Sequence, residues 1–196
     1  APHDLEVLPR SRFTRIDLST DAGIQDVFRH LANDQARTES IASAVRDAVG
    51  QGRKVLVLTE RTEHLDAIKT ELDGLLPVPF VLHGRMSKKQ RSALVADLDA
   101  LPPDAPRVLL STGKLVGEGF DHPPLDTLVL AMPVSWKGTL QQYAGRLHRE
   151  HASKADVRII DFVDTGHPAL LRMWDKRQAG YKAMGYRLGR DMAVTE

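Results

Sequence analysis

Two arginines three residues apart, Arg146 and Arg149, are the side chains of this sequence best suited to chemistry on phosphate. At that spacing both side chains project from the same face of a helix. Each guanidinium keeps its charge and offers a planar fork of N–H donors that matches phosphate oxygens. Taken alone, an exposed helix face with Glu150 and Asp156 as ion-pair partners explains such a pattern more often. The pair therefore predicts a phosphate-binding site only if other segments support it.

A glycine-rich segment, residues 112–123, reads TGKLVGEGFDHP and follows an apolar run. Glycines such as Gly119 let a backbone approach a ligand closely, and the Asp121 carboxylate can accept hydrogen bonds from a ribose hydroxyl. A tight connection with turn glycines explains the segment equally well. It is not a dinucleotide-binding fingerprint, because His122 occupies the position of the third glycine.

Residues 82–91 carry Arg85, Lys88, Lys89 and Arg91 without any acidic residue. These cations open an expected helix, whose N-terminal amides also favour anions. Such a surface suits the phosphate backbone of a nucleic acid, although a merely solvated basic face is the alternative. The last helical region is basic as well. Its aromatic side chains, Trp174, Tyr181 and Tyr186, are expected to pack on the sheet rather than to stack on bases.

Several classes of function are excluded or disfavoured by composition. The chain of 196 residues has no cysteine, which removes disulfides and thiol catalysis and suits the reducing cytoplasm in which we expect the protein. His148 and His151 have helical spacing but no third ligand, so we expect no metal site. No apolar run is long enough to span a membrane. The formal net charge of +1 predicts no partner, and the start without a methionine indicates a piece of a longer chain.

The elements that must position these residues form an alternating pattern of strands and helices. Near-continuous apolar runs are typical of parallel strands with both faces covered. We predict strands at Val55–Thr59, Phe80–Leu82, Val108–Ser111, Thr127–Met132 and Val157–Val163, and an additional strand at Phe13–Leu18. Helical patterns fill the gaps between them. The fold class is therefore α/β, a three-layer domain with a mostly parallel sheet and helices on both faces.

Local signals place several helix boundaries. Ser87 and Gln90 have the spacing of a capping box at the start of a helix, and Pro168 suits a first helical turn. The proline-rich stretch 101–106 is expected to be a loop. We predict an N-terminal extension or interlobe segment over residues 1–35 and one domain over residues 36–196.

Together, four segments in this order resemble a known family. They are Thr59-Glu60-Arg61, then His83-Gly84, then STxxxxGEGFDHP at residues 111–123, then QxxGRxxR at residues 142–149. They resemble motifs IV, IVa, V and VI in the second RecA-like lobe of superfamily 2 helicases, in the style of restriction-enzyme subunits and repair helicases. The resemblance covers about residues 35–190. It implies a RecA-like fold and a role in an ATP-dependent helicase or translocase.

The resemblance also implies roles for single residues. Arg146 and Arg149 would point toward the γ-phosphate of ATP, with Arg149 as the arginine finger, and Gln142 would lie beside them. Gly119 and Asp121 would lie near the ribose. Residues toward the phosphate backbone of a nucleic-acid strand would be Arg61, His83, Gly84, Lys88, Ser111, Thr112 and Lys114.

Departures and absences refine the expectation. Glu118 precedes Gly119 where RNA-remodelling DEAD-box proteins have arginine, and Gln142 replaces their histidine, which favours DNA over RNA. The chain contains neither GxxxxGK[ST] nor an Asp-Glu dipeptide. The phosphate cradle and the Mg²⁺ ligands would therefore belong to a separate N-terminal lobe, the expected partner, and this chain alone should hydrolyse no ATP.

Two alternatives stay open from the sequence. One is a non-catalytic nucleic-acid-binding or interaction module with a degenerate RecA-like fold, which the arginine pair at residues 146 and 149 disfavours. The other is a self-contained α/β enzyme, for which the sequence shows no nucleophile elbow and no acid pair.

Overall fold

The computed structural model describes residues 4–13, 15–16, 22–116, 120–147 and 154–192. Its strands are β1 (Asp4–Arg12), β2 (Lys54–Thr59), β3 (Phe80–Leu82), β4 (Arg107–Thr112), β5 (Thr127–Leu130), β6 (Asp156–Asp164) and β7 (Arg187–Leu188). Its helices are α1 (Ile24–Ala32), α2 (Gln35–Gly50), α3 (Thr62–Glu71), α4 (Lys88–Asp99), α5 (Gly113–Val116), α6 (Gly138–Arg146) and α7 (Pro168–Ala183).

The strands form one seven-stranded sheet in the order β3-β4-β2-β5-β6-β1-β7. Every strand pairing described in this sheet is parallel. The five strands predicted between residues 55 and 163 are present, with β5 ending at Leu130 rather than at Met132, and the predicted α/β class is confirmed. Because the strands are parallel, their carboxyl ends meet at one edge of the sheet.

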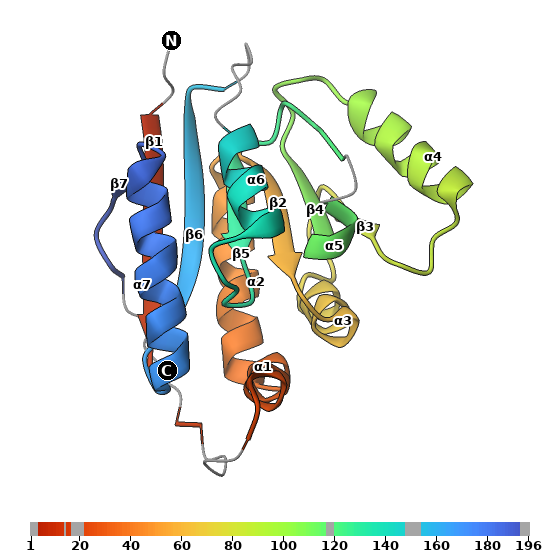
Figure 1. The fold of residues 1–196 in the computed structure, drawn as a ribbon. Coiled ribbons are helices and arrows are strands. Elements are labelled where there is room, and N and C mark those ends of the chain that lie inside the picture. Colours follow the sequence, from red (N-terminus) through yellow and green to blue (C-terminus); the bar gives the residue numbers. More distant parts are fainter. Residues whose placement is uncertain (1–3, 14, 17–21, 117–119, 148–153, 193–196) are drawn as a thin grey trace.

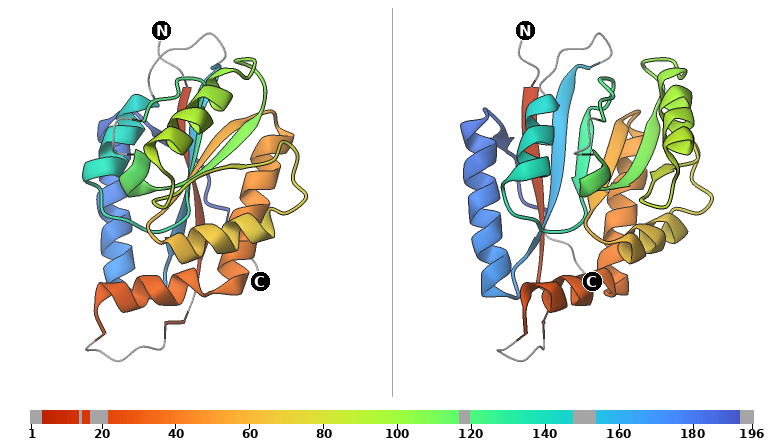
Figure 2. Two further views of the ribbon diagram at one scale, coloured as in Figure 1. Left: turned by 90° about the vertical axis from the view of Figure 1, so that its right-hand side faces the viewer. Right: turned by 45° about the vertical axis from the view of Figure 1, so that its right-hand side comes forward.

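Helices cover both faces of the sheet, as the edge-on view in Figure 2 shows. α6 and α7 lie in front of the sheet in Figure 1, and α2 lies behind it. In the front core, helices α4, α5, α6 and α7 pack on the sheet, and its buried residues include Leu128, Leu140 and Tyr143. The back core packs α2 and α3 on the alternate residues of the same strands, such as Val57 and Val129. Both faces being buried explains the continuous apolar runs.

Several helix boundaries follow from local chemistry, as predicted. The Ser87 hydroxyl accepts a hydrogen bond from the Gln90 amide at 3.1 Å, and the Gln90 side chain accepts one from the Ser87 amide at 2.8 Å, which completes the capping box of α4. Pro168 is the first residue of α7. Residues 101–106 form the predicted loop.

The first strand differs from the sequence prediction. We expected a strand at Phe13–Leu18, but β1 is Asp4–Arg12 and pairs with β6 and β7 inside the sheet. Its sequence, DLEVLPRSR, hides the strand pattern because charged residues and Pro9 interrupt the apolar positions. Part of the segment predicted to be an N-terminal extension thus contributes to the same sheet as the rest. Within the part of the chain described here, no helix has the length and apolarity needed to cross a bilayer.

Candidate functional site

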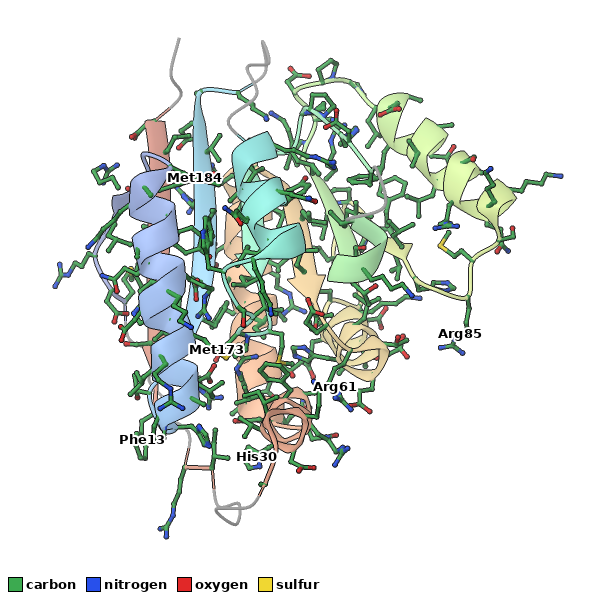
Figure 3. All side chains as sticks on the ribbon, viewed as in Figure 1. Phe13, His30, Arg61, Arg85, Met173 and Met184 are labelled. Carbon is green, nitrogen blue, oxygen red and sulfur yellow. The ribbon has the colours of Figure 1, made fainter. Side chains whose placement is uncertain are left out.

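Three of the four motif segments follow neighbouring strands. β3, β4 and β2 lie side by side, and their last residues are in register, with Thr59 opposite Thr112 and Leu82 opposite Ser111. We call the surface formed by residues 60–61, 83–88 and 112–114 the carboxyl edge. Figure 3 shows Arg61 and Arg85 at this end of the sheet. The parallel topology therefore brings together segments that lie 20 to 50 residues apart in the chain.

Most predicted nucleic-acid residues on the carboxyl edge are accessible. Lys88 and Lys114 are exposed, and so is Gly84, where a Cβ atom would meet only open space. His83 is half-buried, and its Nδ1 accepts a hydrogen bond from the Arg85 amide at 3.3 Å. This edge therefore presents positive charge and backbone groups to solvent, a surface chemistry that suits phosphate.

Arg61 lies at the same edge and already has a local partner. It precedes the first turn of α3, and its Nε donates to Glu63 Oε1 at 2.6 Å. Because the Glu63 side chain is half exposed, this pair is a solvent-screened one that another anion can replace.

Ser111 is the predicted contact residue that the structure places differently. Its side chain is fully buried, and its hydroxyl donates to the Thr112 carbonyl at 3.0 Å. Ser111 is still inside β4, where every residue up to Ser111 is buried. Its hydroxyl is therefore directed into the protein, whereas Thr112 is half-buried at the strand end.

The fourth motif segment, on α6, meets the glycine-rich segment on the front of the sheet. The Arg146 guanidinium donates through Nη1 to the Phe120 carbonyl, across 26 residues of sequence. Arg146 is half-buried, and Gln142 and Asp121 are exposed. We call residues 120–121 together with 142, 143 and 146 the α6 seam. Gly119 and Arg149 lie outside the described residues.

The charges of Asp121 and Arg146 both affect the pKa of the buried Tyr143. Burial raises the pKa of the Tyr143 phenol, and the negative charge of Asp121 raises it further, while the positive charge of Arg146 lowers it. Asp121 and Arg146 therefore both act on the same buried ring. The α6 seam therefore places a guanidinium and a carboxylate next to the same buried ring.

His122 has a role that sequence reasoning missed. It is buried, with Nδ1 at 2.8 Å from Asp99 Oδ1 and Nε2 at 3.0 Å from Arg107 Nη1. A guanidinium can only donate, so Nε2 accepts and the proton is on Nδ1, directed to Asp99. Burial lowers the pKa of His122, which favours this neutral form. His122, the residue after Asp121, thereby connects the glycine-rich segment to Asp99 at the end of α4.

A second missed histidine lies under the carboxyl edge. His64 Nδ1 is 2.7 Å from the Thr59 hydroxyl, and the side chain is fully buried. Burial lowers the pKa of His64 to about 3, and the charge of Arg37 contributes in the same direction. The motif segment Thr59-Glu60-Arg61 contains one partner of this contact, but His64 lies three residues beyond that segment and carries no motif signal.

The described part of the chain contains no group of three or more histidine, aspartate or glutamate residues that could hold a metal ion.

Comparison with known proteins identifies the family. The model of the helicase conserved C-terminal domain matches residues 38–151, more than half of the chain. The uncharacterized protein 108L of Invertebrate iridescent virus 3 is 37% identical over 100 residues, which are 50% of this chain and 88% of that protein. The probable helicase D10 of Escherichia phage T5 is 25% identical over 162 residues, covering 83% of this chain and 34% of the phage protein. The chain thus spans about a third of that helicase.

Solved structures show the same fold. The crystal structure of T4 UvsW matches 96% of this chain, with a TM-score of 0.71 and 16% sequence identity, over 42% of its own length. The C-terminal part of the Fun30 ATPase domain matches 64% of this chain and 40% of its own, with a TM-score of 0.54 and 19% identity. The predicted RecA-like fold is therefore confirmed. The family match shows that this chain belongs to the helicase conserved C-terminal domain family.

Proposed function

We propose that this lobe completes an ATP site formed with an N-terminal RecA-like lobe and grips the phosphate backbone of a nucleic-acid strand. Arg146 and Arg149 would supply guanidinium groups to ATP, and Gly119, Asp121 and Gln142 would line the site beside them. The work done on the nucleic acid would be helicase or translocase activity. The name of the related phage protein, a probable helicase, supports this reading.

One observation carries the proposal, namely the contact between α6 and the glycine-rich segment. The Arg146 guanidinium donates to the Phe120 carbonyl beside the exposed Asp121 carboxylate. Arginine can donate to phosphate oxygens, and aspartate can accept from ribose hydroxyls, so these residues fit a nucleotide. They do not fit Mg²⁺, because the described residues offer no acidic cluster there. The Mg²⁺ ligands would therefore come from the other lobe.

The proposed division of work explains why an isolated lobe would be inactive. When bound, ATP supplies the phosphoryl group whose transfer to water powers the motor. Arg146 and Arg149 would stabilise negative charge only after the two lobes close, because they lie on a different lobe from the phosphate-binding loop. Arginine fingers contribute on the order of 10³ to 10⁵ in rate, so closure would act as the switch.

The carboxyl edge would hold the nucleic acid. Lys88, Lys114 and Arg61 offer positive charge there, and Gly84 leaves room for a backbone to approach closely. Gln142 and Glu118 depart from the residues of RNA-remodelling proteins, which favours DNA as the substrate.

The decisive experiment uses the two-lobed protein that contains this chain and measures ATP hydrolysis with single-stranded DNA. We expect Arg146→Ala and Arg149→Ala each to lower kcat by about 10³-fold, because each removes a positive charge from the transition state. DNA affinity, measured by fluorescence anisotropy, should stay within about two-fold, because neither arginine is on the carboxyl edge.

Arg172→Ala is the matched control, since Arg172 is an exposed arginine on α7 away from the α6 seam. It should leave kcat unchanged. Wild-type turnover in both test variants would contradict the proposal. Tight DNA binding with no ATPase in the two-lobed protein would favour the non-catalytic binding module instead.

A further inference from the structure

The end of α6 is held from outside the helix by a tyrosine. α6 ends at Arg146, and two residues earlier the Ala144 carbonyl accepts a hydrogen bond of 2.8 Å from the Tyr186 hydroxyl. Tyr186 is buried and lies between α7 and β7. We propose that Tyr186 is a positioning residue for Arg146, an inference that rests on the proposed role of Arg146 at the ATP site.

The reason lies in the chemistry of a helix end. Carbonyl groups in the last turn are those that a helix satisfies least with its own amides, so external donors define where the last turn sits. Tyr186 supplies one such donor to Ala144. Lys154 supplies another, since its Nζ lies 3.4 Å from the Leu147 carbonyl. Side chains from two other segments therefore fix the turn from which Arg146 projects.

Tyr186 is itself attached to a rigid support. Its ring packs edge-to-face on Tyr181, with centroids 6.0 Å apart. The Tyr181 hydroxyl donates to Asp161 at 2.9 Å, and the same carboxylate receives two hydrogen bonds of 2.9 Å from Arg177. Tyr181, Asp161 and Arg177 are all fully buried. Contacts through Tyr181 and Asp161 therefore connect Tyr186 to the buried strand β6.

The same support holds the segment that leads into α6. Arg177 donates through Nη1 to the Val134 carbonyl at 3.0 Å, and the Trp136 ring packs on Tyr181 with centroids 5.0 Å apart. Gly180 makes room for that ring, because a Cβ atom there would lie 2.0 Å from the indole. α7 therefore contacts the chain before α6, and the residues that directly follow α7 contact the end of α6. Met184, labelled in Figure 3, is one of them: its methyl group is 4.0 Å from where a Cβ atom on Gly145 would lie. α6 is placed on the sheet by α7 as well as by its own apolar face.

A small shift in the position of Arg146 should affect turnover more than binding. A shift of about 1 Å in a catalytic group can lower a rate by about 10²-fold, whereas substrate affinity responds much less. Loss of the Tyr186 hydroxyl removes one of the two external donors to the last turn of α6, while the ring contact with Tyr181 remains. The effect should therefore appear in turnover rather than in binding.

The test is Tyr186→Phe in the two-lobed protein, measured as kcat and KM for ATP with single-stranded DNA. We expect kcat to fall on the order of ten-fold, with KM and DNA affinity changed by less than about two-fold. Ile68→Val is the control, because it removes one methyl group from the buried core on the other face of the sheet. It lowers stability by a comparable amount and should leave kcat unchanged. Equal kcat values in the two variants would overturn the proposal.

A double variant separates this inference from the proposed function. If Arg146→Ala alone leaves kcat unchanged, the role of Arg146 itself is wrong. If Arg146→Ala lowers kcat, Tyr186→Phe should have no further effect in its background, because the residue it positions is gone. A full further loss of kcat in the double variant would show that Tyr186 acts by another route.

A second readout needs only this chain. The Leu147 amide donates to the Tyr143 carbonyl at 3.0 Å and closes the described end of α6. Its hydrogen exchange should be several-fold faster in Tyr186→Phe than in Ile68→Val. Identical exchange in the two variants would show that Tyr186 does not hold the helix end.

Discussion

Arginines in two regions of this lobe have different partners. One region is the α6 seam together with the carboxyl edge, and the other is the buried interior around β6. On β6, Asp164 receives two hydrogen bonds of 3.1 Å from Arg37, and Asp161 receives two of 2.9 Å from Arg177. All four side chains are fully buried. At the carboxyl edge and the seam, Arg61 pairs with a half-exposed glutamate, and Arg146 donates to a backbone carbonyl.

The oxygen atoms around an arginine, and not the residue type, therefore determine its role in this protein. A buried guanidinium needs a buried carboxylate in fork-to-fork geometry, because desolvation is costly. Once paired in this way, its donors are used within the fold. An arginine whose partner among the described residues is a carbonyl or a screened carboxylate keeps donors for an external anion. We therefore expect substitutions in the interior to affect stability and substitutions at the carboxyl edge and the α6 seam to affect function.

Removing a carboxylate should have the largest effect on stability in the interior. Asp161→Asn leaves the Arg177 charge buried without its counter-charge, and we expect a loss of about 3 to 5 kcal/mol in the free energy of unfolding. Glu63→Gln removes the carboxylate partner of Arg61 and should cost less than about 0.5 kcal/mol. Urea denaturation of this chain measures both. Similar losses for the two variants would contradict the distinction between the regions.

A change of pH should affect the interior through His64, a buried side chain that stays neutral next to Arg37. Its pKa in the folded chain is about 3, against an ordinary value of 6.5, so the unfolded chain binds this proton more readily. Stability from this group is complete above pH 6.5 and is lost as the pH falls toward 3. Between pH 7 and pH 5 the loss should be about 2 kcal/mol.

His64→Gln removes the titrating group and tests this contribution. The difference in unfolding free energy between pH 7 and pH 5 should be smaller in the variant than in the wild type, as urea denaturation would show. An unchanged pH dependence would mean that the pKa of His64 is not lowered in the folded chain.

The smallest expected effects are those of single cations on the carboxyl edge. Lys88→Ala and Lys114→Ala should each weaken single-stranded DNA binding by about two- to five-fold and reduce the slope of log K against log salt by about 0.7. Lys182→Ala, an exposed lysine near the end of α7, is the control and should change neither. Fluorescence anisotropy over a salt series measures the slope. Equal slopes in all three variants would place the nucleic acid elsewhere.

Elements whose signals are local could be predicted from the amino-acid sequence. The apolar runs predicted β2, β3, β4 and β6, and the spacing of Ser87 and Gln90 predicted the start of α4. The order of the motif segments predicted the RecA-like fold, and parallel topology alone then implied that segments after β2, β3 and β4 meet at one edge. These predictions succeeded because each depends on residues a few positions apart or on strand order.

Contacts between polar groups, in contrast, became visible only in the folded chain. Arg37 and Asp164 are 127 residues apart, and the Tyr186 hydroxyl reaches a carbonyl 42 residues away. Nothing in the sequence shows that Arg177 is buried while the neighbouring Lys176 is exposed, or that the Ser111 hydroxyl is directed inward while Thr112 reaches the surface. β1 escaped prediction because its apolar positions are few and its stability comes from its neighbours β6 and β7. The physical reason is common to all of these cases: burial and charge pairing are properties of the packed neighbourhood, which forms only when distant segments come together.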